Sequence, residues 1–301
     1  MSQLNRVVSS VPGSTSNCGS GFDSLGLGLS IYNRITVERT GYSNEGEDLM
    51  PVSSMVRETA QAFFDETGID PFDARVLVSG DVPQARGLGS SVTLRGGILA
   101  GLQRLAGLDW PVDRLVAFVT DLEGHPDNAS ASLMGGFTVS QFGDTPGEWK
   151  HTIRFPIGDG LRFVVVSPEF EVLTTNARGM LPERMAFDEV VTSVNGVSCM
   201  VAAMASGDYE ALRGTVKDFI HEPYRLKGIP GAMAAIQSGI EVGAYTGWLS
   251  GSGSSVLCVC SQEQVAPVGA AMKQAFAAKG LDSIERDLRA DNDGLTILSL
   301  E

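Results

Sequence analysis

The chain has 301 residues, of which 43% are hydrophobic, and this is enough to bury the cores of two ordinary domains. Lysine and arginine together number 22 against 36 aspartates and glutamates, which gives a formal net charge of −14. Broad binding to nucleic acid or to an anionic membrane requires a basic surface, so the acidic balance argues against both. We therefore expect two domains and small-molecule partners.

The cysteines and the apolar segments indicate the compartment. The four cysteines, at positions 18, 199, 258 and 260, show no C-x-x-C spacing. Residues 1–5 carry no apolar run, and no window reaches the roughly 18 apolar residues that a membrane helix requires. We expect a soluble, cytoplasmic protein whose thiols are reduced.

The first half of the chain begins with two predicted strands, over residues 6–11 and 31–39, joined by a polar, glycine-rich loop. This loop contains Asn17 and Asp23, which could bind an amine or a hydroxyl of a substrate. The alternative is that both side chains only cap their own turns.

A glycine-rich stretch, residues 80–91, lies between a predicted strand over residues 74–79 and a predicted helix over residues 92–106. Strand, glycine-rich turn and helix in this order can bring backbone amides around a phosphate. Gly87 and Gly89 allow a positive φ and a close approach to an anion. The alternative is a plain turn before a capped helix.

This stretch is not the common P-loop, which has a lysine directly before its Ser or Thr, because Ser90 occupies that position. The first lysine of the chain is Lys150. Phosphate charge would have to be met by amides, by the helix N-terminus, by arginines such as Arg86 and by a metal ion. Ser90 and Ser91 can cap the helix while offering hydroxyls to phosphate or metal.

A further predicted helix begins near Pro111 and ends at Glu123, which opens the segment EGHPDN. Glu123 is a possible oxygen ligand for Mg²⁺, and Asn128 is a possible substrate contact. The alternative makes both residues end-caps of helices. His125 is one of only three histidines, and their spacing does not favour a zinc site.

The second half is predicted to begin near residue 158. Its predicted strands cover residues 161–166, 244–249, 256–260, 283–288 and 295–300, and its predicted helices cover residues 187–205, 208–220, 231–241 and 264–279. The sequence of elements, strand, helices, strand, strand, helix, strand, is that of a ferredoxin-like domain. The whole chain is therefore predicted to be α+β.

Two arginines of the second half stand in polar segments. Arg178 ends TTNAR and Arg225 ends HEPYR. The guanidinium group can bind a carboxylate through two parallel hydrogen bonds, so two such groups would suit an acidic or amino-acid substrate. The alternative is that both are solvated surface arginines.

Four blocks occur in the order found in one known family: NCGSGFD at residues 17–23, PQARGLGSS at 83–91, EGHPDN at 123–128 and LSGSGSS at 249–255. On these blocks, nearly the whole chain resembles the GHMP small-molecule kinases, and within them the homoserine kinase family. The resemblance implies an N-terminal ATP-binding domain, residues 1–158, with a left-handed β-α-β crossover. It implies a C-terminal ferredoxin-like domain, residues 159–301, with the active site between the two.

The resemblance also implies a reaction, namely ATP-dependent phosphorylation of the side-chain hydroxyl of L-homoserine to O-phospho-L-homoserine in threonine biosynthesis, by a homodimer. Ser91 and Glu123 would hold Mg²⁺, and with Asn128 they would form the catalytic set. The implied ATP contacts are Pro83, Arg86, Gly87, Leu88, Gly89, Ser90 and Ser91; the implied substrate contacts are Asn17, Asp23, Asn128, Thr174, Arg178 and Arg225; and Gly251 and Gly253 would shape a structural loop. The arginines would take the substrate carboxylate and Asp23 its ammonium group.

The chain departs from the family pattern at several positions. Residues 92–95, Val-Thr-Leu-Arg, stand where the family usually has alanines. Cys18 and Ser20 replace a usual Leu and Pro, and residues 254–255 replace a usual Pro-Thr pair. The changes in the first and last blocks bear on the substrate side of the site more than on the ATP side, whereas residues 92–95 bear on how the helix packs beneath the nucleotide.

Two alternatives to homoserine phosphorylation stay open on the sequence. The first is a kinase of the same fold that acts on another small hydroxy compound, such as L-threonine. The second is a non-catalytic relative that binds an amino acid or a nucleotide. The presence of both Ser91 and Glu123 argues against the second, because a binding module does not need a pair of metal ligands.

Overall fold

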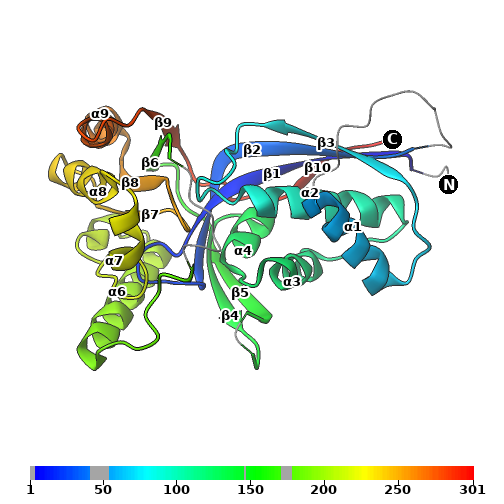
Figure 1. The fold of residues 1–301 in the computed structure, drawn as a ribbon, viewed down its shortest axis with the longest axis horizontal. Coiled ribbons are helices and arrows are strands. Elements are labelled where there is room, and N and C mark those ends of the chain that lie inside the picture. The colour runs from blue at the N-terminus through cyan, green and yellow to red at the C-terminus, as the bar shows by residue number, and fades with distance from the viewer. Residues whose placement is uncertain (1–3, 41–53, 146, 171–177) are drawn as a thin grey trace.

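The computed structural model describes residues 4–40, 54–145, 147–170 and 178–301. Two β-sheets organise these residues, and helices pack against each sheet (Figure 1). The predicted α+β architecture with two domains is confirmed.

The first sheet has six strands in the order β10-β1-β2-β4-β5, with β3 also paired to β2, and all pairings are antiparallel. The strands are β1 (Arg6–Ser16), β2 (Leu25–Arg39), β3 (Ala74–Gly80), β4 (Phe137–Phe142), β5 (Trp149–Phe155) and β10 (Thr296–Leu300). The long strand β2 pairs with β1, with β3 near its end and with β4 near its start. It is therefore the central element of the first half.

Four helices pack below this sheet in Figure 1: α1 (Ser54–Thr67), α2 (Ser90–Leu105), α3 (Val112–Glu123) and α4 (Asp127–Met134). Helix α2 lies very close to β2. A Cβ atom added at Gly97 would come within 2.3 Å of the Ile35 side chain, and one added at Gly101 would come within 2.3 Å of Val37. These glycines permit the close contact, which fixes the position of the α2 N-terminus and of the glycine-rich loop before it.

The second sheet has the antiparallel order β7-β8-β6-β9. Its elements are β6 (Leu161–Pro168), α6 (Phe187–Ser206), α7 (Glu222–Arg225), α8 (Ala232–Glu241), β7 (Thr246–Leu249), β8 (Val256–Ser261), α9 (Val265–Ala277) and β9 (Ser283–Leu288). Short 3₁₀ turns cover Tyr209–Leu212, Leu226–Gly228 and Gln262–Gln264. This order and pairing match the ferredoxin-like arrangement that the sequence predicted.

The last strand does not belong to the second sheet. The predicted C-terminal domain ran from residue 159 to residue 301 and so included it, but β10 pairs with β1 and lies in the first sheet. The chain therefore crosses back at its end, which ties the two halves together. Local sequence pattern predicts that a strand exists, but it does not identify the partner of that strand.

The helix predicted over residues 208–220 is also wrong, because only the 3₁₀ turn Tyr209–Leu212 forms there. Gly214 has a φ of +72°, which interrupts a helix. The Asp218 carboxylate accepts hydrogen bonds of 2.7 to 2.9 Å from the backbone N–H groups of residues 220, 221 and 222, the last of which begins α7. The Asp218 carboxylate therefore binds the backbone where α7 begins, and residues 213–220 do not form a helix.

Helix α6 has the length and composition of a membrane span, contrary to the expectation that no segment of this chain has them. It is 20 residues long with a mean hydropathy of 1.2. Core helices of globular domains meet the same criterion. Met200, Ala203 and Met204 pack from α6 into a core with Phe163 of β6 and Trp248 of β7, so one face of the helix belongs to the second domain.

One hydrophobic cluster of the described residues spans both halves, and each half also has a cluster of its own. Leu25 and Leu27 of β2 pack in the same cluster as Phe163 and Trp248 of the second sheet. The Trp248 indole N–H also donates a 3.0 Å hydrogen bond to the Thr15 hydroxyl of β1. The junction is thus a packed contact, and the loops at its edge hold fixed positions.

Candidate active site

A cleft of about 350 Å³ lies at the junction and is lined by loops of both halves. Of the predicted site residues, it is lined by Asn17, Asp23, Pro83, Arg86, Gly87, Leu88, Gly89, Ser90, Ser91, Glu123, Asn128, Arg178, Arg225 and Gly251. Thr174 lies outside the described residues. Gly253 does not line the cleft; a Cβ atom there would come within 2.6 Å of the Ile229 side chain, so its role is in packing.

The glycine-rich loop depends on its glycines at two places. Gly87 and Gly89 have φ angles of 69° and 70°. A Cβ atom at Gly87 would lie 2.0 Å from the Ser250 carbonyl oxygen, and one at Gly89 would lie 2.4 Å from the Ser14 hydroxyl. The Ser250 hydroxyl donates a 2.7 Å hydrogen bond to the Gly87 carbonyl, so the second glycine-serine turn holds the first one in place.

Helix α2 begins at Ser90, and its N-cap residue is Gly89, which makes no side-chain cap. The expectation that the loop serines cap this helix is therefore wrong. Because Gly89 has no side chain, no N-cap oxygen takes the first N–H groups of the helix, and their partial positive charge faces the cleft. This is the arrangement in which helix N-termini bind phosphate.

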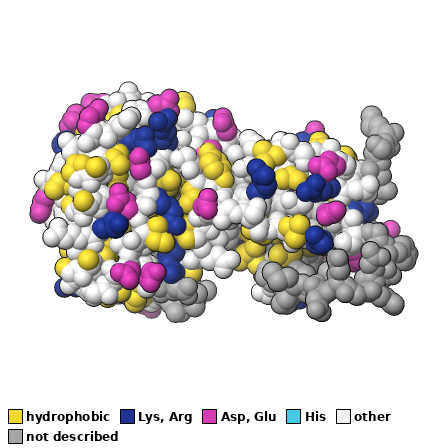
Figure 2. Space-filling view, turned by 90° about the horizontal axis from the view of Figure 1, so that it is seen from above, with side chains coloured by type: hydrophobic (Ala, Val, Ile, Leu, Met, Phe, Trp, Pro, Cys, Tyr) yellow, Lys and Arg dark blue, Asp and Glu magenta, His cyan; other side chains and the backbone are white. Residues whose placement is uncertain are grey.

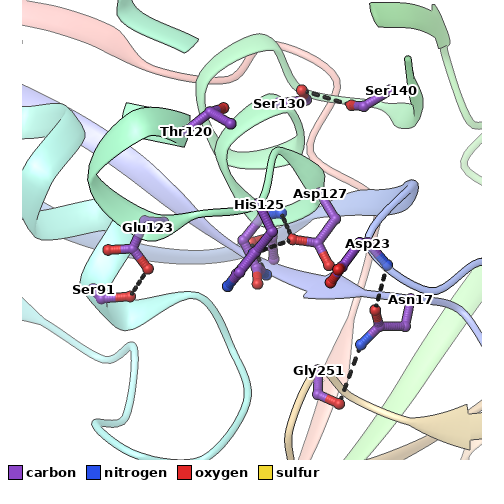
Figure 3. A network of polar contacts seen from close by, with 12 residues as sticks. Asn17, Asp23, Ser91, Thr120, Glu123, His125, Asp127, Ser130, Ser140 and Gly251 are labelled. Atoms are coloured by element: carbon purple, nitrogen blue, oxygen red, sulfur yellow. Dashed lines mark hydrogen bonds and ion pairs between the residues drawn. The ribbon is translucent and has the colours of Figure 1, made fainter. Parts of the chain in front are cut away.

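The Ser91 hydroxyl instead donates a 2.8 Å hydrogen bond to Glu123 Oε2 (Figure 3). The other carboxylate oxygen, Oε1, accepts a 2.7 Å hydrogen bond from Arg95 Nε. Glu123 ends α3, and Gly124, with a φ of 81°, turns the chain away after it. Hydroxyl and carboxylate oxygens are ligands that suit Mg²⁺. Ser91 and Glu123, which lie at the N-terminal end of α2, therefore fit a Mg²⁺ site.

His125 and Asp127 form an ion pair beside the Mg²⁺ candidates, with 2.7 Å between His125 Nδ1 and Asp127 Oδ1 (Figure 3). Burial alone would lower the pKa of His125, but the charge and hydrogen bond of Asp127 outweigh it and raise the pKa to about 9. Possible ligand atoms of these two residues and of Asp23 lie within 4.8 Å of one another. Because Asp127 raises the pKa of His125, these three residues form a cluster of opposite charges at the cleft near pH 7.

His125→Gln is expected to lower the free energy of unfolding near neutral pH and to have little effect at high pH. The pKa in the folded protein is about 9, above the ordinary 6.5. Stabilisation by the protonated ring is therefore complete below about pH 6.5 and is lost as the pH rises through about 9, with a magnitude of roughly 3 kcal/mol. Urea unfolding of both proteins from about pH 6 to about pH 10 measures this, and a difference independent of pH would contradict it.

Asn17 and Asp23 lie in a loop with a strained backbone. Asn17, Cys18 and Asp23 have φ angles of 67°, 46° and 56°. The Asn17 side chain accepts a 3.0 Å hydrogen bond from the Asp23 N–H and donates one of 3.2 Å to the Gly251 carbonyl (Figure 3). Asn17 thus links this loop to the second glycine-serine turn and positions Asp23 at the cleft.

Both predicted arginines reach the same cleft. The Arg178 guanidinium makes two hydrogen bonds to the Asp23 carboxylate, of 2.9 and 2.8 Å. Arg225 is buried, with 4% of its surface exposed, and donates a 3.2 Å hydrogen bond to the Gly251 carbonyl. The two guanidinium carbons lie 5.2 and 5.1 Å from the centre of the Phe22 ring. The interpretation as solvated surface arginines does not hold for Arg225.

The residues before Arg225 hold it in place. Glu222 is buried and accepts a 2.7 Å hydrogen bond from the Leu249 N–H, and burial raises its pKa to about 8. His221 is fully buried, and burial lowers its pKa, so the ring is neutral near pH 7. Its Nε2 lies 2.8 Å from the Gly19 carbonyl and donates to it. The segment HEPYR therefore anchors Arg225 between the two halves.

The cleft carries a positive balance in an acidic protein. Four arginines, at positions 86, 95, 178 and 225, and protonated His125 face three carboxylates, at positions 23, 123 and 127. Figure 2 shows basic and acidic side chains interspersed over the face it presents, without a continuous basic stripe there. Positive charge at the cleft suits an anionic ligand such as a nucleotide.

Two features of the site are not predicted from the sequence: the contacts of Arg95 and the pairing of His125 with Asp127. A signal for the ion pair was present, because both residues closely follow the helix predicted to end at Glu123, in EGHPDN. The signal for Arg95 was its departure from the alanines that the family usually has after the loop serines.

Two family models match the chain: GHMP kinases N terminal domain over residues 54–136 and GHMP kinases C terminal over residues 200–278. The first covers α2 with its glycine-rich loop and the Ser91–Glu123 pair, and the second covers much of the ferredoxin-like domain. Fold and site together define a GHMP kinase, an enzyme that uses ATP.

Proteins similar to the whole chain indicate which member of the GHMP kinase class it resembles. The chain is 33% identical to homoserine kinase of Moorella thermoacetica over 295 residues, which cover 96% of this chain and 98% of the relative. It is also 33% identical to homoserine kinase of Aquifex aeolicus, with the same coverage. A solved structure of homoserine kinase from Cytophaga hutchinsonii has the same fold, with a TM-score of 0.86 at 23% identity over 99% of each chain. The chain belongs to the homoserine kinase family.

Proposed function

We propose that the protein transfers the γ-phosphoryl group of ATP to the side-chain hydroxyl of L-homoserine, which gives O-phospho-L-homoserine for threonine biosynthesis. One observation carries the proposal: Asp23, Arg178 and Arg225 meet in the same cleft as the N-terminus of α2. The cleft thus combines groups for both charges of an amino acid with a phosphate site. The homoserine kinases that match nearly the whole chain support this substrate.

The charged groups suit a zwitterion. Asp23 and Arg178 pair with each other at 2.8 Å. An amino acid can replace this ion pair, because its ammonium group can bind the Asp23 carboxylate and its carboxylate can bind the two arginines. Phe22 lies beneath both guanidinium groups and orients them. Asn128 is held in place by a 2.9 Å hydrogen bond that it donates to the Ser14 hydroxyl. We assign it the role of binding the side-chain hydroxyl of homoserine.

The phosphate side is built from the glycine-rich loop, Arg86 and the first turn of α2. Ser91 and Glu123 would hold Mg²⁺, which neutralises phosphate charge when it is bound. The loop amides supply fixed donors, and the packing of the loop on the second glycine-serine turn keeps them in place. Phosphoryl transfer requires positioning and charge neutralisation more than covalent chemistry, and these residues supply both.

Coupled detection of ADP tests the proposal. Purified protein with Mg²⁺ and ATP is assayed with L-homoserine, L-threonine, mevalonate or no acceptor. We expect release that depends on homoserine and exceeds release with the other acceptors. Preferred turnover of another acceptor would keep the kinase and change its substrate. Absence of turnover with every acceptor would favour a ligand-binding relative.

We further propose that the protein is a homodimer. Along α6, Phe187, Val191 and Val194 are 84%, 51% and 56% exposed, and no charged residue follows Glu189 in this helix. A second copy of the chain can cover this stripe with the same stripe of its own, as two-fold symmetry requires. Light scattering after size exclusion is expected to give twice the mass of the chain, and Val191→Glu is expected to give a monomer. A monomeric parent protein would contradict this.

We also propose that the protein works in the cytoplasm. All four cysteines are free, and three of them are buried. This pattern suits a reducing compartment. Cell fractionation followed by immunodetection measures it, and recovery in a membrane or secreted fraction would contradict it.

A further inference from the structure

Arg95 is a buried cation at the edge of the cleft, with 8% of its surface exposed. It stands one helical turn after Ser91 on α2, so the two side chains lie on the same face of the helix. It also stands among the residues where the chain departs from its family, and no role in the reaction proposed above uses it. A buried arginine requires partners, and the identity of these partners indicates its role.

The partners of Arg95 come from two other helices. Its Nε donates a 2.7 Å hydrogen bond to Glu123 Oε1 at the end of α3. On α1, its Nη1 donates a 3.1 Å hydrogen bond to the Thr59 hydroxyl, and its Nη2 lies 3.5 Å from Glu58 Oε2. The guanidinium plane is thus held on three sides.

Thr59 is itself oriented. Its hydroxyl donates a 2.7 Å hydrogen bond to the Met55 carbonyl, which directs an oxygen lone pair toward Arg95. Thr59 is fully buried in the contact between α1 and α2. Because the guanidinium group is planar and its two Nη atoms are held by Thr59 and Glu58, its Nε–H group points toward Glu123.

We propose that Arg95 is a positioning residue for the metal site. It holds Oε1 of Glu123, so that Oε2 stays beside the Ser91 hydroxyl in the orientation that binds Mg²⁺. This inference rests on the proposed role of Ser91 and Glu123 as metal ligands. Without Arg95, the Glu123 carboxylate, whose side chain is 12% exposed, loses the cation that fixes it and can rotate away from Ser91.

A second effect would act against this one. The positive charges of the Arg95 guanidinium group and of Mg²⁺ repel each other, and this repulsion would weaken metal binding. The charge of Arg95 is shared between two carboxylates, of Glu123 and Glu58, and this reduces its field at the metal position. The geometry therefore favours positioning, and the two effects predict opposite results for the same variant.

The test measures binding, not turnover. A fluorescent ADP analogue is titrated into the protein with Mg²⁺ and, separately, with EDTA, and the ratio of the two Kd values gives the gain from Mg²⁺. For Arg95→Met we expect this gain to fall about tenfold or more, with the Kd in EDTA within about twofold of the parent protein. Arg104→Met is the matched control, because Arg104 lies on the same helix and pairs with the exposed Asp109 outside the cleft. It should keep the full gain.

Arg95→Lys gives a second measurement, which decides if Arg95→Met does not fold. Lysine keeps the charge but has no planar fork to reach Glu123 and Thr59 together, so an intermediate gain is expected. An unchanged or larger gain in either Arg95 variant would overturn the inference. So would equal weakening of binding in Mg²⁺ and in EDTA, which indicates a structural role only. If Glu123→Gln keeps the gain from Mg²⁺, the proposed metal site itself fails, and the inference fails with it.

Discussion

Replacing Glu123 by glutamine is expected to lower kcat by about 1000-fold, equivalent to about 4 kcal/mol in activation free energy. The amide oxygen can accept the hydrogen bond from Arg95 Nε, and the amide NH2 group can then donate to the Ser91 hydroxyl oxygen, so both contacts of this side chain can be kept. The negative charge that Mg²⁺ requires is lost, and with it most of the neutralisation of phosphate charge in the transition state. The measurement is kcat at saturating homoserine and ATP over a range of Mg²⁺ concentrations.

Glu66→Gln is the matched control for this variant. Glu66 also pairs with an arginine, Arg114, at 3.4 Å, but its side chain is 55% exposed and does not line the cleft. Its substitution should leave kcat within about twofold and change the free energy of unfolding by less than about 1 kcal/mol. If Glu123→Gln is as active as Glu66→Gln, the assignment of Glu123 as a metal ligand is wrong.

Replacing Arg225 by alanine is expected to raise the KM for homoserine about 30-fold, which corresponds to about 2 kcal/mol for a charged hydrogen bond lost from the substrate carboxylate. The KM for ATP should change little, because Arg225 lies beside Phe22 and Gly251, on the side of the cleft opposite to the Ser91–Glu123 pair in our assignment. Steady-state kinetics with each substrate varied in turn measures the two constants.

Arg213→Ala is the control for general effects of removing an arginine from the second domain. Arg213 also lies over an aromatic ring, 5.0 Å from the centre of Tyr245, but it does not line the cleft. Its substitution should leave the KM for homoserine unchanged. A parallel rise of both KM values in Arg225→Ala would mean that the residue supports the fold of the cleft, and an unchanged KM for homoserine would remove it from the site.

Much of the fold could be predicted from the sequence, because the signals for it are local. Apolar periodicity and Pro111 predicted a helix ending at Glu123, and α3 covers Val112–Glu123. The alternation of strands and helices in the second half predicted a ferredoxin-like sheet, and the pairing confirms it. The strand β10 was assigned to the wrong domain because its pairing with β1 spans nearly the whole chain, and no local pattern records such a partner.

The candidate site was predicted in a different way. Periodicity and composition alone left a purely structural alternative for the site residues, such as a helix cap or a solvated surface side chain. The resemblance of four separated blocks to one family predicted that these residues form one site. Arg95 and the contact of Asp23 with Arg178 could not be predicted, because they depend on the relative placement of helices and loops that are 28 and 155 residues apart in sequence. Capping by the loop serines was the natural local expectation, but the contact of Ser91 with Glu123, 32 residues away, takes its hydroxyl.

Identification of the phosphorylated product tests directly whether the protein transfers phosphate from ATP to the homoserine hydroxyl. Parent protein and Glu123→Gln are incubated with Mg²⁺, ATP and L-homoserine, and the mixtures are followed by ³¹P NMR together with ADP release. We expect one new phosphomonoester signal, coupled to the side-chain CH₂ protons of homoserine, that grows in equal amount with ADP in the parent protein and is nearly absent in the variant. ADP release without this ester, or a faster-growing ester when L-threonine replaces homoserine, would contradict it.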